Sequence, residues 1–62
     1  MVALRERIRR LIHMQRQVNE QAYRFSQETE DREIQRVISE VIGRGNENIQ
    51  ELAKLLVVKC GT

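Results

Sequence analysis

Apolar residues recur along most of this 62-residue chain at alternating intervals of four and three, the spacing of one side of an α-helix. A first series starts at Leu4 and ends at Phe25, and a second starts at Ile34 and ends at Leu55. No such series crosses residues 26–31. The pattern therefore predicts an all-α, two-helix antiparallel hairpin in one domain, 1–62, with a helix over about 3–28, a turn over about 29–31 and a helix over about 32–59.

The residues at the predicted helix ends agree with these bounds. Asp31 or Thr29 can accept hydrogen bonds from the first free N–H groups of the second helix, and Glu30 and Glu33 suit the positive end of its dipole. Gly61 follows the last turn, where a glycine commonly ends a helix. The chain has no proline, so nothing of that kind interrupts either helix.

Two glycines allow an alternative with three helices. Gly43 and Gly45 each cost about 1 kcal/mol inside a helix, and Asn48 could cap a new helix after them. The apolar series nevertheless keeps its phase across this region. A loop would leave that phase free to reset, so we favour one continuous second helix.

The chain is too small to bury a large core by itself. A domain of this length is marginal unless a disulfide, a metal or a partner supports it. Its single cysteine, Cys60, excludes an internal disulfide, and its single histidine, His13, excludes a Cys/His zinc site. A partner remains, most simply a second copy.

The apolar face of the second helix is wider than one neighbouring helix can cover, because Ile42, Ile49 and Leu56 lie beside the main series. We therefore expect a homodimer, forming a four-helix bundle, with a higher oligomer as the alternative. The residues expected in its seam are Leu4, Ile8, Leu11, Val18, Ala22, Phe25, Ile34, Ile38, Val41, Ile42, Ile49, Leu52, Leu55 and Leu56.

The charges favour an antiparallel dimer. Residues 1–16 carry a local charge of +4, residues 17–40 carry −3 and residues 41–62 carry +1, for a net charge of +2. A hairpin places the basic termini at one end and the acidic turn at the other. Two such rods attract when they pack head to tail, although each exposed pair is weak.

Three residues interrupt the apolar series with polar or small side chains. Gln15, Gly45 and Asn48 stand where aliphatic residues are expected, and a turn near residue 30 brings them level. We interpret them as a hydrogen-bonded polar core layer that fixes register, as one buried asparagine does in coiled coils. Amides are poor ligands for transition metals, so a metal layer is the weaker interpretation.

Part of the chain resembles one hairpin of the ferritin-like and rubrerythrin-like proteins, including short bacterial members. The resemblance rests on residues 22–25 (Ala-Tyr-Arg-Phe), 28–31 (Glu-Thr-Glu-Asp) and 48–52 (Asn-Ile-Gln-Glu-Leu). Metal-binding members carry a glutamate about seven residues before the tyrosine and a Glu-x-x-His motif on the second helix. Here those positions hold Arg16 and the stretch 45–48 (Gly-Asn-Glu-Asn). The resemblance thus implies a hairpin without the di-iron site, and no cofactor.

A hairpin of this length is also similar in architecture to the Rop family of plasmid copy-control proteins, which bind paired RNA loops. That similarity implies a possible RNA-binding surface on the first helix, formed by Arg5, Arg9, His13, Arg16 and Arg24. The low net charge and the lack of aromatic residues among these bases make nucleic acid the less favoured partner.

No nucleophile with its base, phosphate loop or small-molecule site is evident. No apolar run, that at residues 55–58 included, exceeds four residues, which is much shorter than a membrane span. We therefore expect a non-enzymatic, cytoplasmic, structural or protein-interaction module. The alternatives are an RNA-binding hairpin dimer and, third, a ferritin-like metal-binding hairpin.

Overall fold

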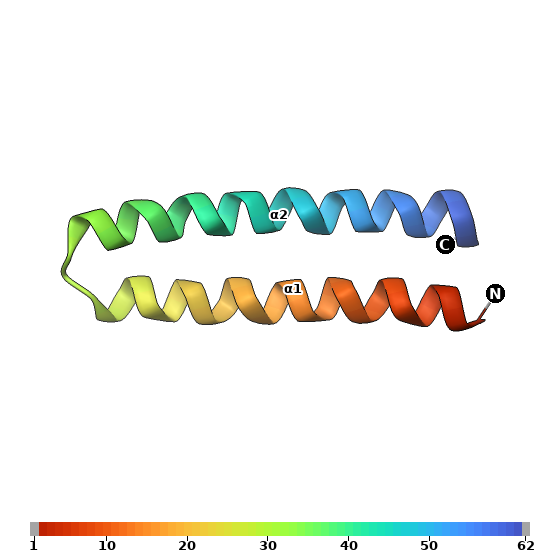
Figure 1. The fold of residues 1–62 in the computed structure, drawn as a ribbon, viewed down its shortest axis with the longest axis horizontal. Coiled ribbons are helices and arrows are strands. Elements are labelled where there is room, and N and C mark those ends of the chain that lie inside the picture. Colours follow the sequence, from red (N-terminus) through yellow and green to blue (C-terminus); the bar gives the residue numbers. More distant parts are fainter. Residues whose placement is uncertain (1, 62) are drawn as a thin grey trace.

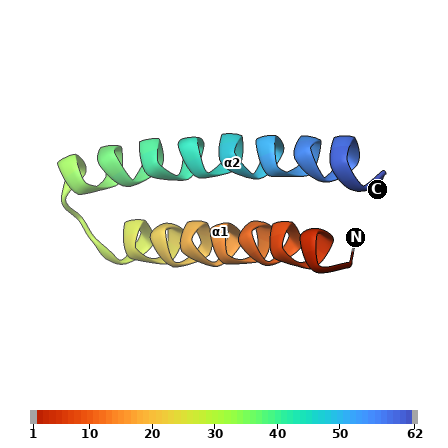
Figure 2. The same ribbon diagram turned by 45° about the vertical axis from the view of Figure 1, so that its right-hand side comes forward.

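The computed structural model describes residues 2–61, which form two helices, α1 (Val2–Glu28) and α2 (Arg32–Cys60). Of the described residues, 93% are helical and none lies in a strand. The helices lie side by side and antiparallel, so both chain ends lie at the same end of the rod (Figures 1 and 2). The rod measures 46 × 14 × 11 Å between Cα atoms. The predicted all-α hairpin is confirmed.

Side chains of the turn satisfy the free backbone groups of both helices. The Asp31 carboxylate accepts hydrogen bonds from the N–H groups of Glu33 (2.9 Å) and Ile34 (3.1 Å), which confirms it as the N-cap of α2. The Gln35 side-chain amide donates to the carbonyl of Thr29 (2.8 Å) and to that of Ser26 (3.4 Å). Because Ser26 lies in the last turn of α1 and Thr29 directly follows that helix, Gln35 joins the end of α1 to the first turn of α2.

The second helix is continuous through Gly43 and Gly45. The prediction of one continuous second helix is therefore confirmed, and the alternative with three helices is wrong. Gly61 ends the helix as predicted, in the left-handed conformation (φ 76°), and its N–H donates to the carbonyl of Val57 at 2.9 Å.

The seam between the helices is narrow, and its apolar core is small. Ile8 and Ile12 of α1 and Ile38 of α2 are its buried apolar side chains, joined by the buried Asn19 and Gly45. Around them lie residues that are only partly buried: Ala22, Ile34, Val41, Ile42, Ile49, Leu52 and Leu56.

The α1 side of this seam differs by one position from the predicted stripe. Ile12 and Asn19 face α2, whereas Leu11 and Val18 are half exposed. Both stripes share Ile8 and the partly buried Ala22, and two helices in contact bury only one narrow strip. The rest of the apolar surface must then remain outside the hairpin.

Within residues 2–61, no helix combines the length and the apolar character needed to cross a membrane.

Candidate functional site

Helix α1 carries a row of large apolar side chains outside the hairpin seam. Its members lie seven residues apart, so each is two helical turns from the next and all point to the same side of α1. Each is between 41 and 52% exposed. The row consists of Leu4, Leu11, Val18 and Phe25.

Helix α2 extends the same side of the molecule. A shallow groove between the helices is lined by Leu11 from α1 and by Asn48 and Leu52 from α2, so these residues share one surface. Val41 and Leu55 lie seven residues before and after Asn48, which puts them on this side as well. We call this surface the open face and define it as Leu4, Leu11, Val18, Phe25, Val41, Asn48, Leu52 and Leu55.

A chain of four amides crosses the molecule at mid-length, starting at the open face. The Asn48 amide donates to the Gln15 side-chain oxygen (3.5 Å), and the Gln15 amide donates to that of Asn19 (3.3 Å). Asn19 in turn donates to the Asn46 side-chain oxygen (3.1 Å). The first and the last of these three hydrogen bonds each join α1 to α2. Asn19, in the middle of the amide chain, is buried.

Gly45 makes room for this chain. A Cβ atom at Gly45 would overlap the Asn19 side-chain oxygen and would lie 2.9 Å from the Gln15 side-chain nitrogen. By contrast, a Cβ at Gly43 would meet nothing within 4 Å. Of these two glycines, only Gly45 is therefore required for the close packing of α2 against the Asn19 and Gln15 side chains.

The three residues of the predicted polar layer differ in their positions in the hairpin. Gln15 belongs to it and Gly45 is buried beside it, but Asn48 is exposed in the hairpin and not in its core. Asn19 and Asn46 also belong to the amide chain and were not predicted from the sequence. Asn19 lies one position beyond the apolar series, and the residues seven before and after it are Ile12 and Ser26. Because this row mixes apolar and polar side chains, its spacing did not predict that it faces α2.

The opposite side of α1 is polar and basic. Arg9 and Arg16 lie seven residues apart on it, His13 lies between them, and all three are exposed. The two other predicted RNA-binding residues differ. Arg5 is partly buried, and its guanidinium donates to the carbonyl of Cys60 (3.4 Å). The Arg24 guanidinium lies 3.8 Å from the Glu20 carboxylate on the same helix. The structure therefore brings together three of the five predicted bases.

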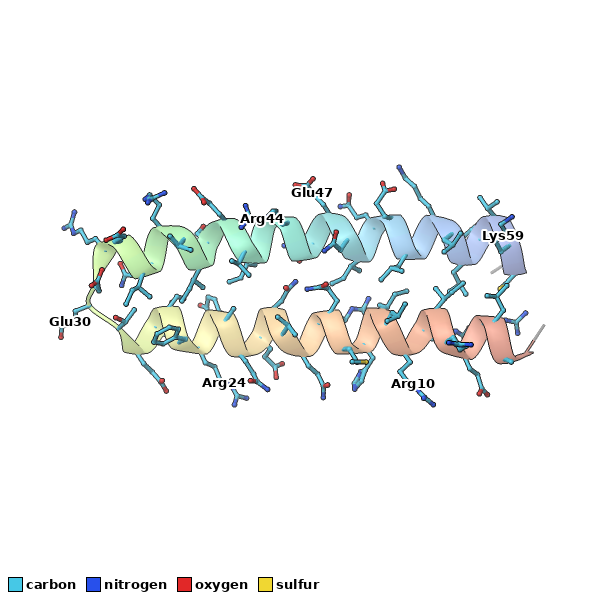
Figure 3. All side chains as sticks on the ribbon, in the orientation of Figure 1. Arg10, Arg24, Glu30, Arg44, Glu47 and Lys59 are labelled. Atoms are coloured by element: carbon cyan, nitrogen blue, oxygen red, sulfur yellow. The ribbon has the colours of Figure 1, made fainter. Side chains whose placement is uncertain are left out.

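Charged side chains contribute little to joining the helices. Ion pairs among the described residues all lie within one helix and are exposed: Arg24–Glu20, Arg36–Glu40 and Lys54–Glu51. Arg10 and Arg24 point away from α2, and Glu47 points away from α1 (Figure 3). The apolar seam and the amide chain therefore hold the hairpin together.

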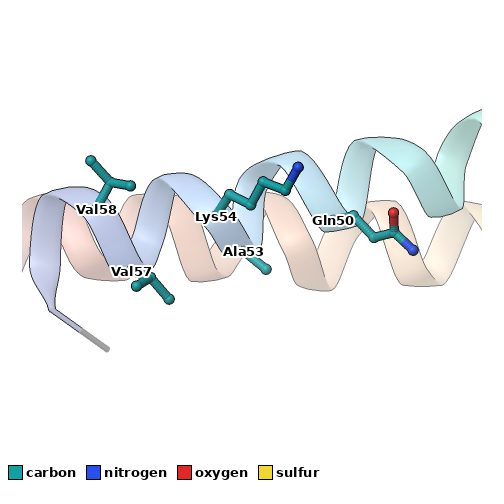
Figure 4. Close-up of a pocket in the computed structure, with 5 residues that line it drawn as sticks. All are labelled: Gln50, Ala53, Lys54, Val57 and Val58. Atoms are coloured by element: carbon teal, nitrogen blue, oxygen red, sulfur yellow. The ribbon is translucent and has the colours of Figure 1, made fainter.

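Two remaining features are a hollow on α2 and a cysteine near its end. A hollow on α2 is lined by Gln50, Ala53, Lys54, Val57 and Val58 (Figure 4), and α1 contributes nothing to it. Cys60 has a free, partly buried thiol. The described part of the chain holds no group of three or more His, Cys, Asp or Glu side chains that could share a metal ion, so no observation supports a metal site.

No protein-family model matches the chain, and neither a curated protein nor a solved structure matches it.

Proposed function

We propose that this protein is a non-enzymatic, cytoplasmic helical module that pairs with a second copy through its open face, as a four-helix bundle. The observation that supports it most is the row of Leu4, Leu11, Val18 and Phe25, which repeats every seven residues and is half exposed in the single hairpin. Repeats of seven apolar residues are typical of helices that pack against other helices. An apolar surface of this continuity marks an interface more often than a free surface.

The small core of the hairpin supports the same proposal. Ile8, Ile12 and Ile38 are its buried apolar side chains, and burial of a whole aliphatic side chain contributes about 1.5–3 kcal/mol. Covering the open face removes more apolar surface from water, at about 25 cal/mol per Å². Pairing would thus provide the stability that a chain of this length lacks alone.

Sedimentation equilibrium of matched double variants tests the proposal. Leu11 and Val18 are 51 and 52% exposed and lie on the open face, whereas Tyr23 and Val57 are 57 and 58% exposed and lie outside it. We expect Leu11→Gln with Val18→Gln to shift the assembly from dimer towards monomer. The pair Tyr23→Gln with Val57→Gln removes a similar exposed apolar surface and should leave the dimer unchanged.

Two outcomes would contradict the proposal. The first is a wild-type chain that sediments at 7.4 kDa while circular dichroism shows it fully helical. The second is an equal effect of the two double variants on self-association, which would mean that apolar contacts are unspecific. If the protein is instead a tetramer that only the open-face double variant dissociates, the proposed interface stands and only the number of copies differs.

A second candidate function, RNA binding, is favoured by the exposed Arg9, His13 and Arg16 on one side of α1. That side lies away from the open face, so a paired hairpin would still present it. Phosphate contacts give an affinity that falls steeply with salt. A gel shift with a structured RNA at low and physiological salt would test this function, with Arg9→Gln and Arg16→Gln expected to abolish binding.

A further inference from the structure

We infer that the second copy lies antiparallel on the open face without axial offset, so that the Gln15–Asn48 pairs of the two copies meet at the centre of the assembly. This inference rests on the proposed function and adds the orientation and the register of the partner. It follows from three observations: where the polar pair lies along the rod, what surrounds it, and how charge is distributed along the chain.

The polar pair lies at mid-length on the open face. Contacts across the seam set Arg5 level with Cys60 and Gln15 level with Asn48. The row from Leu4 to Phe25 has its midpoint beside Gln15. A two-fold axis at that level places Leu4 level with the Phe25 of the partner subunit and Leu11 level with its Val18. The apolar row then matches itself along its whole length.

Burial of the Asn48 amide then determines the register. Asn48 donates to Gln15, and its own side-chain oxygen has no hydrogen-bond donor within the described residues. Covering that oxygen with aliphatic groups is costly, because a buried amide needs partners. A shift by seven residues along the open face would set Asn48 against leucine and valine levels. Only the register without offset brings polar groups of the second copy to this level.

Charge selects between the two orientations that keep this register. Parallel packing also aligns the polar pairs. However, it sets residues 1–16, with a charge of +4, beside the same residues of the second copy, and residues 17–40, with a charge of −3, beside theirs. Antiparallel packing sets each segment beside the opposite charge. Like charges held together disfavour the parallel form, and opposite charges along the rod favour the antiparallel form.

Distances between spin labels on the two copies test the orientation and the register together. Labels are attached to Lys59→Cys or to Glu30→Cys, each in a Cys60→Ser background. Glu30 lies in the turn, and Lys59 follows Leu55, the last open-face residue of α2, by one helical turn, near the chain ends (Figure 3). At 1.5 Å per residue, the inferred arrangement separates two labels at position 59 by about 30 Å along the rod and two at position 30 by about 45 Å.

Other arrangements give different pairs of distances. A parallel dimer brings both label pairs within about 25 Å, the width of a few helices. An antiparallel dimer in which the second copy is shifted by seven residues changes the two distances by about 10 Å, in opposite directions. Either pattern would overturn the inference and leave pairing through the open face intact. Loss of the dimer in sedimentation would instead overturn the proposed function itself.

Discussion

At the scale of single residues, the two glycines of α2 provide a matched pair for a prediction. Gly43→Ala should stabilise the hairpin by about 1 kcal/mol, because alanine favours the helix and its Cβ meets open space. Gly45→Ala should instead destabilise it by about 1–2 kcal/mol, because its Cβ displaces Asn19 and breaks the bond to Asn46. Urea unfolding of both variants at equal protein concentration measures the difference.

A rescue variant identifies the cause. Asn19→Ala together with Gly45→Ala removes both the colliding amide and the space left for it, so the double variant should be more stable than Gly45→Ala alone. Equal stabilisation by the two single glycine variants would mean that Asn19 moves aside freely. The amide chain would then contribute nothing measurable to the hairpin.

The polar layer shows how far residue patterns alone predict this molecule. Gln15 and Gly45 were predicted because they interrupt an apolar series at levels that a hairpin brings together. Asn19 and Asn46 were not predicted, because they lie beside that series and not within it. Choosing between neighbouring stripes depends on side-chain volumes at the contact, here on the small Gly45 admitting Asn19.

At the scale of helices, the turn is determined by side-chain hydrogen bonds. Asp31→Ala should lower the free energy of unfolding by about 1 kcal/mol, because it removes the acceptor for two backbone N–H groups of α2. Glu30→Ala is the control, since it removes an exposed carboxylate one residue earlier and should change stability by less than about 0.5 kcal/mol. Thermal melts followed by circular dichroism compare the two, and equal losses would contradict a capping role.

Gln35 should prove as important for α1 as Asp31 is for α2. Gln35→Glu replaces the donor to the carbonyls of Thr29 and Ser26 with a negatively charged acceptor, and should cost about 1–2 kcal/mol. Gln27→Glu adds the same charge to the exposed last turn of α1 and should cost no more than about 0.5 kcal/mol. Chemical unfolding of the two variants separates loss of the hydrogen bond from the effect of charge. A similar loss in both would assign the effect to charge alone.

The helices were predictable from the sequence to within one residue at each end, and the seam of α1 was not. Apolar spacing and end residues such as Asp31 and Gly61 act locally, so they determine where each helix begins and ends. Which side of α1 faces α2 is a property of the pair of helices. The apolar residues of α1 form two overlapping stripes, with Ile12 on one and Leu11 on the other, and only packing decides which stripe becomes the seam.

At the scale of the whole molecule, these two stripes divide the stabilisation between the hairpin and its proposed assembly. The stripe with Ile8 and Ile12 holds α1 to α2, and the row with Leu11 and Val18 remains for a partner. The amide chain connects the two surfaces, since it begins at Asn48 on the open face and passes through the buried Asn19. Its two ends should therefore serve different purposes, one in the choice of partner and one in the fold.

Replacing each end of the amide chain with leucine tests that division. Asn48→Leu should raise the melting temperature, because an apolar group then covers the centre of the open face. It should also broaden the distance distribution between Lys59→Cys labels, because nothing polar opposes a shifted register. Asn46→Leu should lower stability by about 1–3 kcal/mol, because it leaves the buried Asn19 amide without its acceptor. Its label distances should stay narrow. If Asn48→Leu leaves them equally narrow, charge and the apolar row alone determine the register, and the polar pair has no part in it.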